Sequence, residues 1–188
     1  MIGTDDPTIS PHLKAYLRRE GGPTVVGIIG EGSSRELTAL WESPFENDTP
    51  GSMFAKMGGL AQIETDKTSK SKLNTTQVWS GTTPHNFNLV LEFYAISEAY
   101  NAVQAAVIEL EKCAAPEMNE KTPLGRIPQS VTVRVGKQII YPECVVTSIS
   151  RELDGPISVD GYPLRGSVTL QLQTKATVNQ SDIAGTFG

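Results

Sequence analysis

The chain has 188 residues with a formal net charge of -5, and 38% of its residues are hydrophobic. This length allows one substantial core, and the hydrophobic share lies below that of a typical globular domain, which indicates long polar loops. The acidic balance argues against a protein that binds nucleic acid through a basic face. It does not exclude a protein past which nucleic acid moves without adhering.

Thiol or metal chemistry would depend on two cysteines, Cys113 and Cys144, and two histidines, His12 and His85. These residues do not have the spacing of a four-ligand zinc site. We expect two buried reduced thiols, and the sequence leaves a disulfide between them open.

No apolar run is long enough to span a bilayer, so no membrane contact is expected. The acidic N-terminus lacks the basic and apolar regions of a signal peptide. The sequence therefore predicts synthesis and residence in the cytoplasm.

Residues 1–22 are predicted to form an N-terminal arm that ends in a short helix. Ser10 is a suitable N-cap, Pro11 suits the first turn, and two glycines follow residue 20. In a helix over residues 11–20, Leu13, Tyr16 and Leu17 would share one face. Such a short helix is marginal alone, so we expect it to dock on another element.

Residues 24–29 are rich in β-branched side chains and predict a strand. The glycines and serines of residues 30–34 follow it directly. A phosphate-binding loop would need a lysine and a different glycine spacing, so a turn or β-bulge is the better interpretation.

Residues 31–58 form a long excursion with scattered aromatic side chains such as Trp41. The polar stretch 66–76 follows, and it contains Lys67, Lys70, Lys72 and Leu73. It is either a solvated loop or a hairpin that a neighbouring subunit orders, because long loops of this kind often bind something. We take these four residues as a candidate inter-subunit loop.

The clearest pattern in the chain is a strand followed by a helix over residues 86–112. By the period of two, Phe87, Leu89, Leu91 and Phe93 lie on one apolar face of the strand. In the helix, predicted over residues 97–112 with Ser97 as N-cap, the apolar stripe consists of Tyr100, Val103, Val107 and Leu110. A sheet with one helix across it is the resulting prediction.

Three further strands are predicted over residues 130–135, 138–152 and 164–174, followed by a mobile polar tail over residues 176–188. Pro142 interrupts the second of them and predicts an edge or a bulge, because proline cannot donate to a ladder. On the last strand Thr169, Gln171 and Gln173 point outward and carry no charge. This face fits a surface between subunits or a wall past which something slides, and a solvent face is the alternative.

Catalytic patterns are weak. The two cysteines are expected to fill the core rather than pair with a histidine. Glu152, Asp154 and Asp160 lie around one loop, but they lack the alternating carboxylates of a calcium loop, and Asp-Gly turns explain them better. We expect no enzyme activity, no cofactor and no metal.

A resemblance emerges from two motifs. The first is the run Val78, Trp79, Ser80 and Gly81, with Pro84 shortly after it; the second is the turn Gly161-Tyr162-Pro163 before the last strand. Together with the strand, the Ala-rich helix and the later strands, they resemble the tail-tube and tube-initiator proteins of contractile-tailed phages. The resemblance covers residues 41–175.

The resemblance implies an α+β fold that is mainly antiparallel β, with a sheet or barrel, one flanking helix and long loops. It places a tail-tube-like domain at residues 23–175. It also implies a hexameric ring in the virion, stacked on adjacent baseplate and tail-tube rings, with DNA and tape-measure protein passing through its channel without specific binding.

Within this family we favour a baseplate hub that initiates the tube, because residues 5–20 and 31–58 look like additions for contacts with other proteins. The alternatives are the tail-tube protein itself and a monomeric β-sheet ligand-binding domain. An enzyme that uses Cys144 or the loop with Glu152 and Asp160 is a further alternative.

Overall fold

The computed structural model describes residues 1–42, 76–120 and 123–188. The chain divides into two compact units, one formed by Met1–Leu37 with Pro84–Gly188 and the other by Thr38–Thr83. The first unit contains a β-barrel and a helix. In the second, β5 (Ala39–Glu42) and β6 (Val78–Thr82) pair as antiparallel strands, and we call this pair the β5–β6 hairpin.

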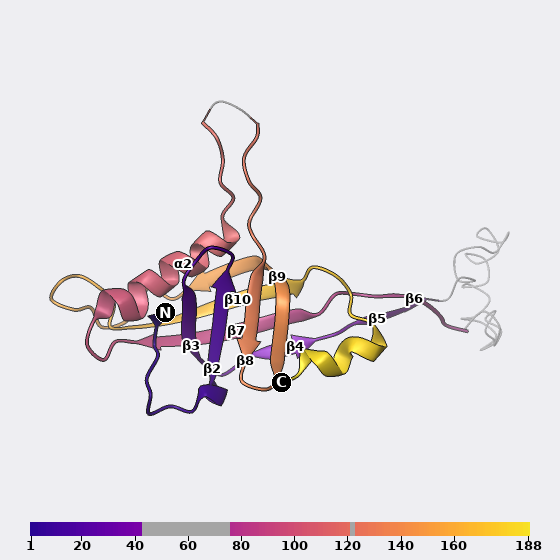
Figure 1. Ribbon diagram of the computed structural model, residues 1–188, viewed down its shortest axis with the longest axis horizontal. Helices are drawn as coiled ribbons and strands as arrows, with labels where there is room; N and C mark the ends of the chain where they lie inside the picture. Colours follow the sequence, from indigo (N-terminus) through magenta and orange to yellow (C-terminus); the bar gives the residue numbers. More distant parts are fainter. Residues whose placement is uncertain (43–75, 121–122) are drawn as a thin grey trace, which may run out of the picture. The chain divides into compact units, whose positions relative to one another are not determined.

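The barrel of the first unit has six antiparallel strands (Figure 1). In chain order they are β2 (Lys14–Arg19), β3 (Thr24–Ile29), β7 (Asn86–Tyr94), β8 (Val131–Val135), β9 (Ile139–Arg151) and β10 (Arg165–Thr174). Their order around the barrel is β3-β2-β8-β9-β10-β7, and β7 closes it by pairing with β3 at Ile28↔Glu92 and Ile29↔Leu91. Two short strands are added: β1 (Ile2–Gly3), parallel to β3, and β4 (Ser34–Glu36), antiparallel to β7. The mainly antiparallel β prediction is confirmed.

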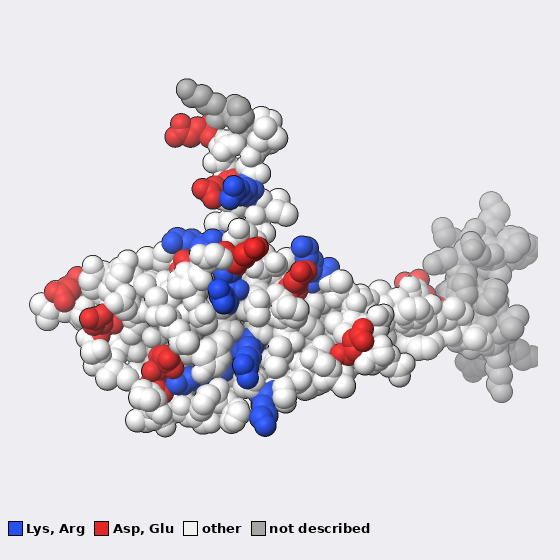
Figure 2. Space-filling view, viewed as in Figure 1, with Lys and Arg blue, Asp and Glu red and all other residues white. Residues whose placement is uncertain are grey.

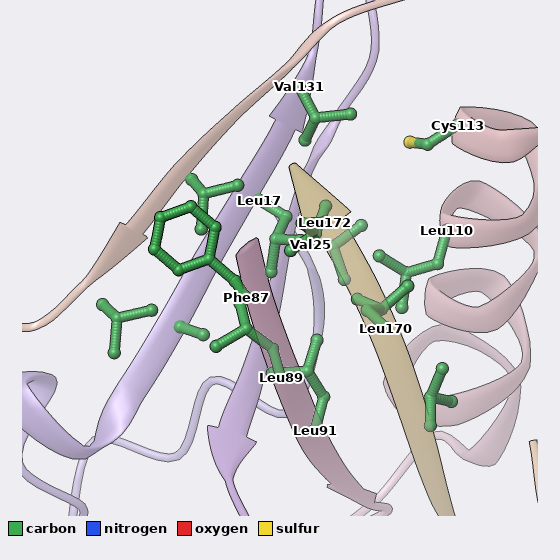
Figure 3. Packing of buried hydrophobic residues seen from close by; sticks show 14 of the residues in the cluster. Leu17, Val25, Phe87, Leu89, Leu91, Leu110, Cys113, Val131, Leu170 and Leu172 are labelled. Atoms are coloured by element: carbon green, nitrogen blue, oxygen red, sulfur yellow. The ribbon is translucent and has the colours of Figure 1, made fainter. Parts of the chain in front are cut away.

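The barrel interior is apolar because each strand alternates inward and outward side chains. In β7 the four predicted residues Phe87, Leu89, Leu91 and Phe93 are all buried. Leu170 and Leu172 of β10 meet them from the adjacent strand (Figure 3). The prediction of an apolar face on this strand is confirmed.

The helix covers this core with its buried side chains (Figure 3). It consists of a π-helical turn, η3 (Tyr100–Gln104), and the α-helix α2 (Ala105–Ala114). Val103, Val107 and Leu110 are buried as predicted, but Tyr100 is 47% exposed. The N–H of Ala105 bonds to the carbonyl of Tyr100, five residues back, and this wider turn rotates Tyr100 out of the stripe. The prediction for Tyr100 is therefore wrong.

The predicted N-terminal helix over residues 11–20 is also wrong. Only a 3-10 turn forms, η1 (Pro11–Leu13), and β2 begins at the next residue. In β2, Ala15 and Leu17 point into the core, and the strand pairs with β3 on one side and β8 on the other. Two ladders outweigh the weak preference of a short isolated helix. Residues 14–19 are therefore part of the barrel, and the predicted boundary at residue 22 falls in the turn between two of its strands.

The interruption at Pro142 is confirmed as a bulge. The β8–β9 register shifts between Val131 and Val133, so that Pro142 and Glu143 lie opposite Thr132. The Thr132 hydroxyl donates to the carbonyl of Pro142 over 3.0 Å. Extra residues of this kind raise the local twist of a strand, which helps a sheet to close.

The C-terminal residues 176–188, predicted as a mobile tail, include the 3-10 helix η4 (Gln180–Thr186). Thr186 is buried, and the N–H of Gly188 donates to the carbonyl of Lys137 over 2.9 Å. The end of the chain thus packs against the β8–β9 turn.

Candidate assembly surfaces

A neutral polar face covers the outside of four neighbouring strands, β4, β7, β10 and β9. One row across it joins Ser34, Asn88, Gln171 and Ser148, which are successive partners in the ladders. Thr169 and Ser150 lie beside one another in the next row. We call these residues the neutral face: Ser34, Asn86, Asn88, Ser148, Ser150, Thr169, Gln171 and Gln173.

Charge borders this face but does not enter its centre. Glu36 lies beside Asn86 at one end, and at the other Glu92 lies 3.5 Å from the guanidinium of Arg165. The outer face of β2 and β8 differs, since it exposes Arg18 and Arg134, and Figure 2 shows Lys and Arg side chains where these strands lie. The outer faces of the two halves of the barrel therefore differ in charge.

The centre of the neutral face is slightly hollowed. A depression of about 330 Å³ lies between β4, β7, β9 and β10, and Asn88, Gln171 and Thr147 are among its lining residues. Thr147 is the extra residue of a bulge in β9, and its hydroxyl donates to the carbonyl of Gln171 over 3.0 Å. The predicted outward direction of Thr169, Gln171 and Gln173 is confirmed, while their role stays a prediction.

The hairpin of the second unit carries the Val78–Gly81 motif. Trp79 pairs with Trp41 across the ladder, and both indoles are more than half exposed, at 55% and 56%. The indole N–H of Trp79 donates to the hydroxyl of Thr82 over 3.2 Å, and the hydroxyl of Ser80 donates to the carbonyl of Leu40. Two exposed tryptophans side by side on paired strands are typical of a contact surface.

The second family motif lies in the loop between β9 and β10. Gly161 adopts a φ of 84°, a backbone conformation that favours glycine, and Pro163 forms a bridge with Ile157. The ring of Tyr162 meets Tyr100 edge-on, with 5.2 Å between ring centroids. The loop is therefore well structured and fixed to the start of the helix.

A buried polar cluster links β4 to the end of the chain. One guanidinium nitrogen of Arg35 lies 3.1 Å from His85 Nε2, 2.9 Å from the hydroxyl of Tyr141 and 3.1 Å from the hydroxyl of Thr186. The guanidinium also lies over the ring of Phe187, at 4.6 Å from its centroid. Within the described residues no carboxylate pairs with Arg35, and its contacts there are neutral acceptors and aromatic rings.

Burial, and the nearby charge of Arg35, lower the pKa of His85. Because a guanidinium can only donate, Nε2 of His85 must accept, and neutral His85 then carries its proton on Nδ1. This atom is buried without a hydrogen-bond partner. Pro84, the motif residue before His85, begins the segment that leads into β7.

Neither cysteine of the chain has the environment of a nucleophile. Cys113 and Cys144 are separate buried thiols, and burial raises their pKa to about 11 and about 12, which disfavours the nucleophilic thiolate. No group of three or more His, Cys, Asp or Glu among the described residues could hold a metal. No helix in this part of the chain is long and apolar enough to cross a membrane.

One predicted site lies outside the described residues, and one cluster in the structure was not predicted. Lys67, Lys70, Lys72 and Leu73, predicted as an inter-subunit loop, lie outside the described residues. The cluster around Arg35 was not predicted, because its hydrogen-bond partners lie 50 to 151 positions from Arg35 and form no local pattern with it. No protein-family model matches the chain, and a search of curated proteins finds no matching relative.

Proposed function

We propose that this chain is a structural protein of a phage tail that forms a closed ring, with the neutral face turned toward the ring's channel. The observation that carries the proposal is the row of uncharged polar side chains across β4, β7, β10 and β9. Such a wall offers hydrogen bonds but no fixed charge to which a polyanion could adhere. The net charge of -5 further weakens adhesion to DNA.

Ring formation needs surfaces that are complementary between copies. The exposed tryptophans of the β5–β6 hairpin supply one candidate for a contact with a neighbouring subunit. The barrel with a covering helix and the two sequence motifs support membership of the tube class. Its partners would be further copies of the chain in a hexamer, the adjacent baseplate and tail-tube rings, and the tape-measure protein and DNA that pass through.

The narrower proposal is an initiator ring at the baseplate that templates the tube, with the tube protein itself as the alternative. Residues 14–19 no longer favour the initiator, because they form a barrel strand rather than an added arm. The predicted excursion over residues 31–58 is also wrong at its start, because Ser34–Glu36 form β4 and pair with β7. The argument for added contacts at the baseplate therefore rests on the second unit, Thr38–Thr83. In either case the protein belongs to the virion and is assembled in the host cytoplasm.

The decisive experiment is the mass of the purified protein in its native state, measured over a range of concentrations together with electron microscopy. A closed ring with a central channel is expected. Particles that remain monomeric at high concentration, with and without tail partners, would count against the proposal. An initiator should form single rings that nucleate a separate tube protein, whereas a tube protein should elongate by itself.

A further inference from the structure

The loop between β9 and β10 exposes apolar side chains at its tip. Val159 is fully exposed, and Ile157 and Leu153 are 67% and 88% exposed. Asp154 and Asp160 flank the tip, and Figure 2 shows acidic side chains at this end of the barrel. Exposed apolar side chains with a charged border are typical of a contact surface.

This loop is held in one shape by its own hydrogen bonds. The N–H of Ser158 donates to the carbonyl of Tyr162 over 2.7 Å, and the N–H of Leu164 donates to the carbonyl of Pro156 over 2.9 Å. The N–H of Ala95 also donates to the carbonyl of Leu164, which ties the loop to the end of β7. A loop that is ordered before contact loses little conformational entropy on binding, so its exposed tip is prepared for a partner.

An apolar groove of about 570 Å³ opens elsewhere on the same unit, a size within the usual range of about 300–1,000 Å³ for binding pockets. It lies between the segment that joins β3 to β4, the turn η1 and the β8–β9 turn. Its apolar lining residues are Leu13, Ile29, Leu89, Val135, Ile139 and Phe187. The charged side chains in its lining are Arg35 and Glu31, and His12 is also present.

The groove and the loop are complementary in charge and polarity. The guanidinium of Arg35 lies within the buried cluster beside the groove, and no carboxylate of the described residues pairs with it. The exposed Lys137 adjoins the groove through Gln138. The loop brings two β-branched side chains between Asp154 and Asp160. Glu31 in the groove lining has the same charge sign as the two aspartates of the loop and would repel them. It is exposed, so water screens its charge.

The loop of one copy points away from its own groove. It extends from the end of the barrel where β9 stops, whereas Phe187 lies near the C-terminus by the β8–β9 turn (Figure 1). We propose that the Asp154–Asp160 loop of one copy docks in the groove of a second copy, with Ile157 and Val159 against its apolar wall. This head-to-tail contact deepens the proposed ring function and rests on it, because contacts of this type close into rings or continue as filaments.

Two surface variants test the contact. Val159→Glu places a charge on the loop and leaves the groove intact, while Leu13→Glu places one in the groove and leaves the loop intact; both residues are exposed, at 106% and 58%, so folding should be retained. Each variant alone should associate at least about tenfold more weakly than the wild type, because Val159 and Leu13 belong to the apolar part of the contact, where a carboxylate would be buried among apolar side chains. Mixed in equal amounts, they should form a dimer and no larger species, since one good loop then meets one good groove.

A crosslink gives a second measurement. Val159→Cys mixed with Leu13→Cys should yield a disulfide-linked dimer under mild oxidation. Val159→Cys mixed with Glu20→Cys, which is exposed in the β2–β3 turn, is the matched control and should not. The background from Cys113 and Cys144 is low, because both are buried with a raised pKa.

The outcomes separate this proposal from the proposed function. If both glutamate variants assemble as the wild type does, the loop–groove contact is wrong while the ring stands. If Val159→Glu is monomeric and the mixture gives no dimer, the loop contacts a surface other than the groove, and the proposal fails. If the wild type itself never assembles, both proposals fall.

Discussion

Arg35 and His85 lie 3.1 Å apart, donor nitrogen to ring nitrogen, in a buried cluster that also contains Tyr141 and Thr186. Two rings pack on the imidazole, Phe87 in a stacked arrangement and Tyr141 at a tilt, with centroid distances of 6.3 and 5.5 Å. Arg35 is the charged group that faces His85 from β4. The imidazole is thus held in its neutral form by both its surroundings and its neighbour.

A pH dependence of stability follows from this pair. The pKa of His85 is lowered in the folded protein, so the unfolded state binds the proton more readily. Stability from this group is fully present above the unfolded pKa of about 6.5 and is lost as the pH falls below it. Urea unfolding of the wild type should therefore shift to lower midpoints between about pH 6.5 and pH 5.

The control for this measurement is the other histidine. His85→Gln should flatten the pH dependence over that interval, whereas His12→Gln should leave it unchanged, because His12 is exposed. An equal pH dependence in the wild type and in His85→Gln would show that the lowered pKa of His85, which burial and then the charge of Arg35 cause, does not contribute.

Leu17 tests the assignment of residues 14–19 to the barrel. Its side chain is 1% exposed and belongs to the main core cluster. Leu17→Ala should lower the free energy of unfolding by about 2–5 kcal/mol, as expected for a buried leucine. Arg18→Ala on the outer face of the same strand should change it by less than about 0.5 kcal/mol. Equal and small effects of both changes would place this segment outside the core.

Local sequence patterns correctly predicted β7 and the bulge in β9. The alternation in residues 86–94 was sufficient for β7, and Pro142 was sufficient for the bulge, because each feature acts through neighbouring residues. Ser10 and Pro11 are typical of a helix start, and they led to the wrong prediction of a helix over residues 14–19. They contain no information on β3 and β8, the two strands that pair with these residues. The same limit explains Tyr100, since a π-turn has no clear sequence signal.

The candidate surfaces were also predictable only in part. The polar side of β10 was predictable from Thr169, Gln171 and Gln173 alone. Its extension across Ser34 and Ser148 was not, because those residues come from strands far away in the sequence and meet only through the ladder. Likewise the sequence predicted a turn between β9 and β10, but it did not predict that Val159 is exposed there.

Glu109 joins the helix to the barrel. Its carboxylate is buried and accepts two hydrogen bonds from Arg19 of β2, the shorter of them 2.6 Å long, and it lies 3.3 Å from the ammonium of Lys112. The hydrogen bond with Glu109 raises the pKa of Arg19. Glu109→Ala should cost about 1–3 kcal/mol in the free energy of unfolding, because it leaves a partly buried guanidinium without its partner. Denaturant titration measures this cost.

Lys112→Ala is the control for the same site. Lys112 is exposed, so its pairing with Glu109 is screened by water, and the change should cost less than about 0.5 kcal/mol. If Glu109→Ala costs no more than this control, the connection between β2 and α2 does not contribute measurably to stability.

The neutral face gives the sharpest test of assembly. The double change Thr169→Glu with Gln171→Glu adds two carboxylates to the outer face of β10 and disturbs no buried side chain, so the folded monomer should persist by circular dichroism. In a ring, each copy would bring these charges to one shared channel, where like charges repel. Native mass measurement should therefore show fewer rings at low salt. High salt should restore them in part, because the screening length falls from about 10 Å at 0.1 M to about 3 Å at 1 M. Arg18→Glu on the face of β2 is the matched control, and it should leave the rings intact. If the double variant assembles as well as this control at every salt concentration, the neutral face does not line a channel or join subunits.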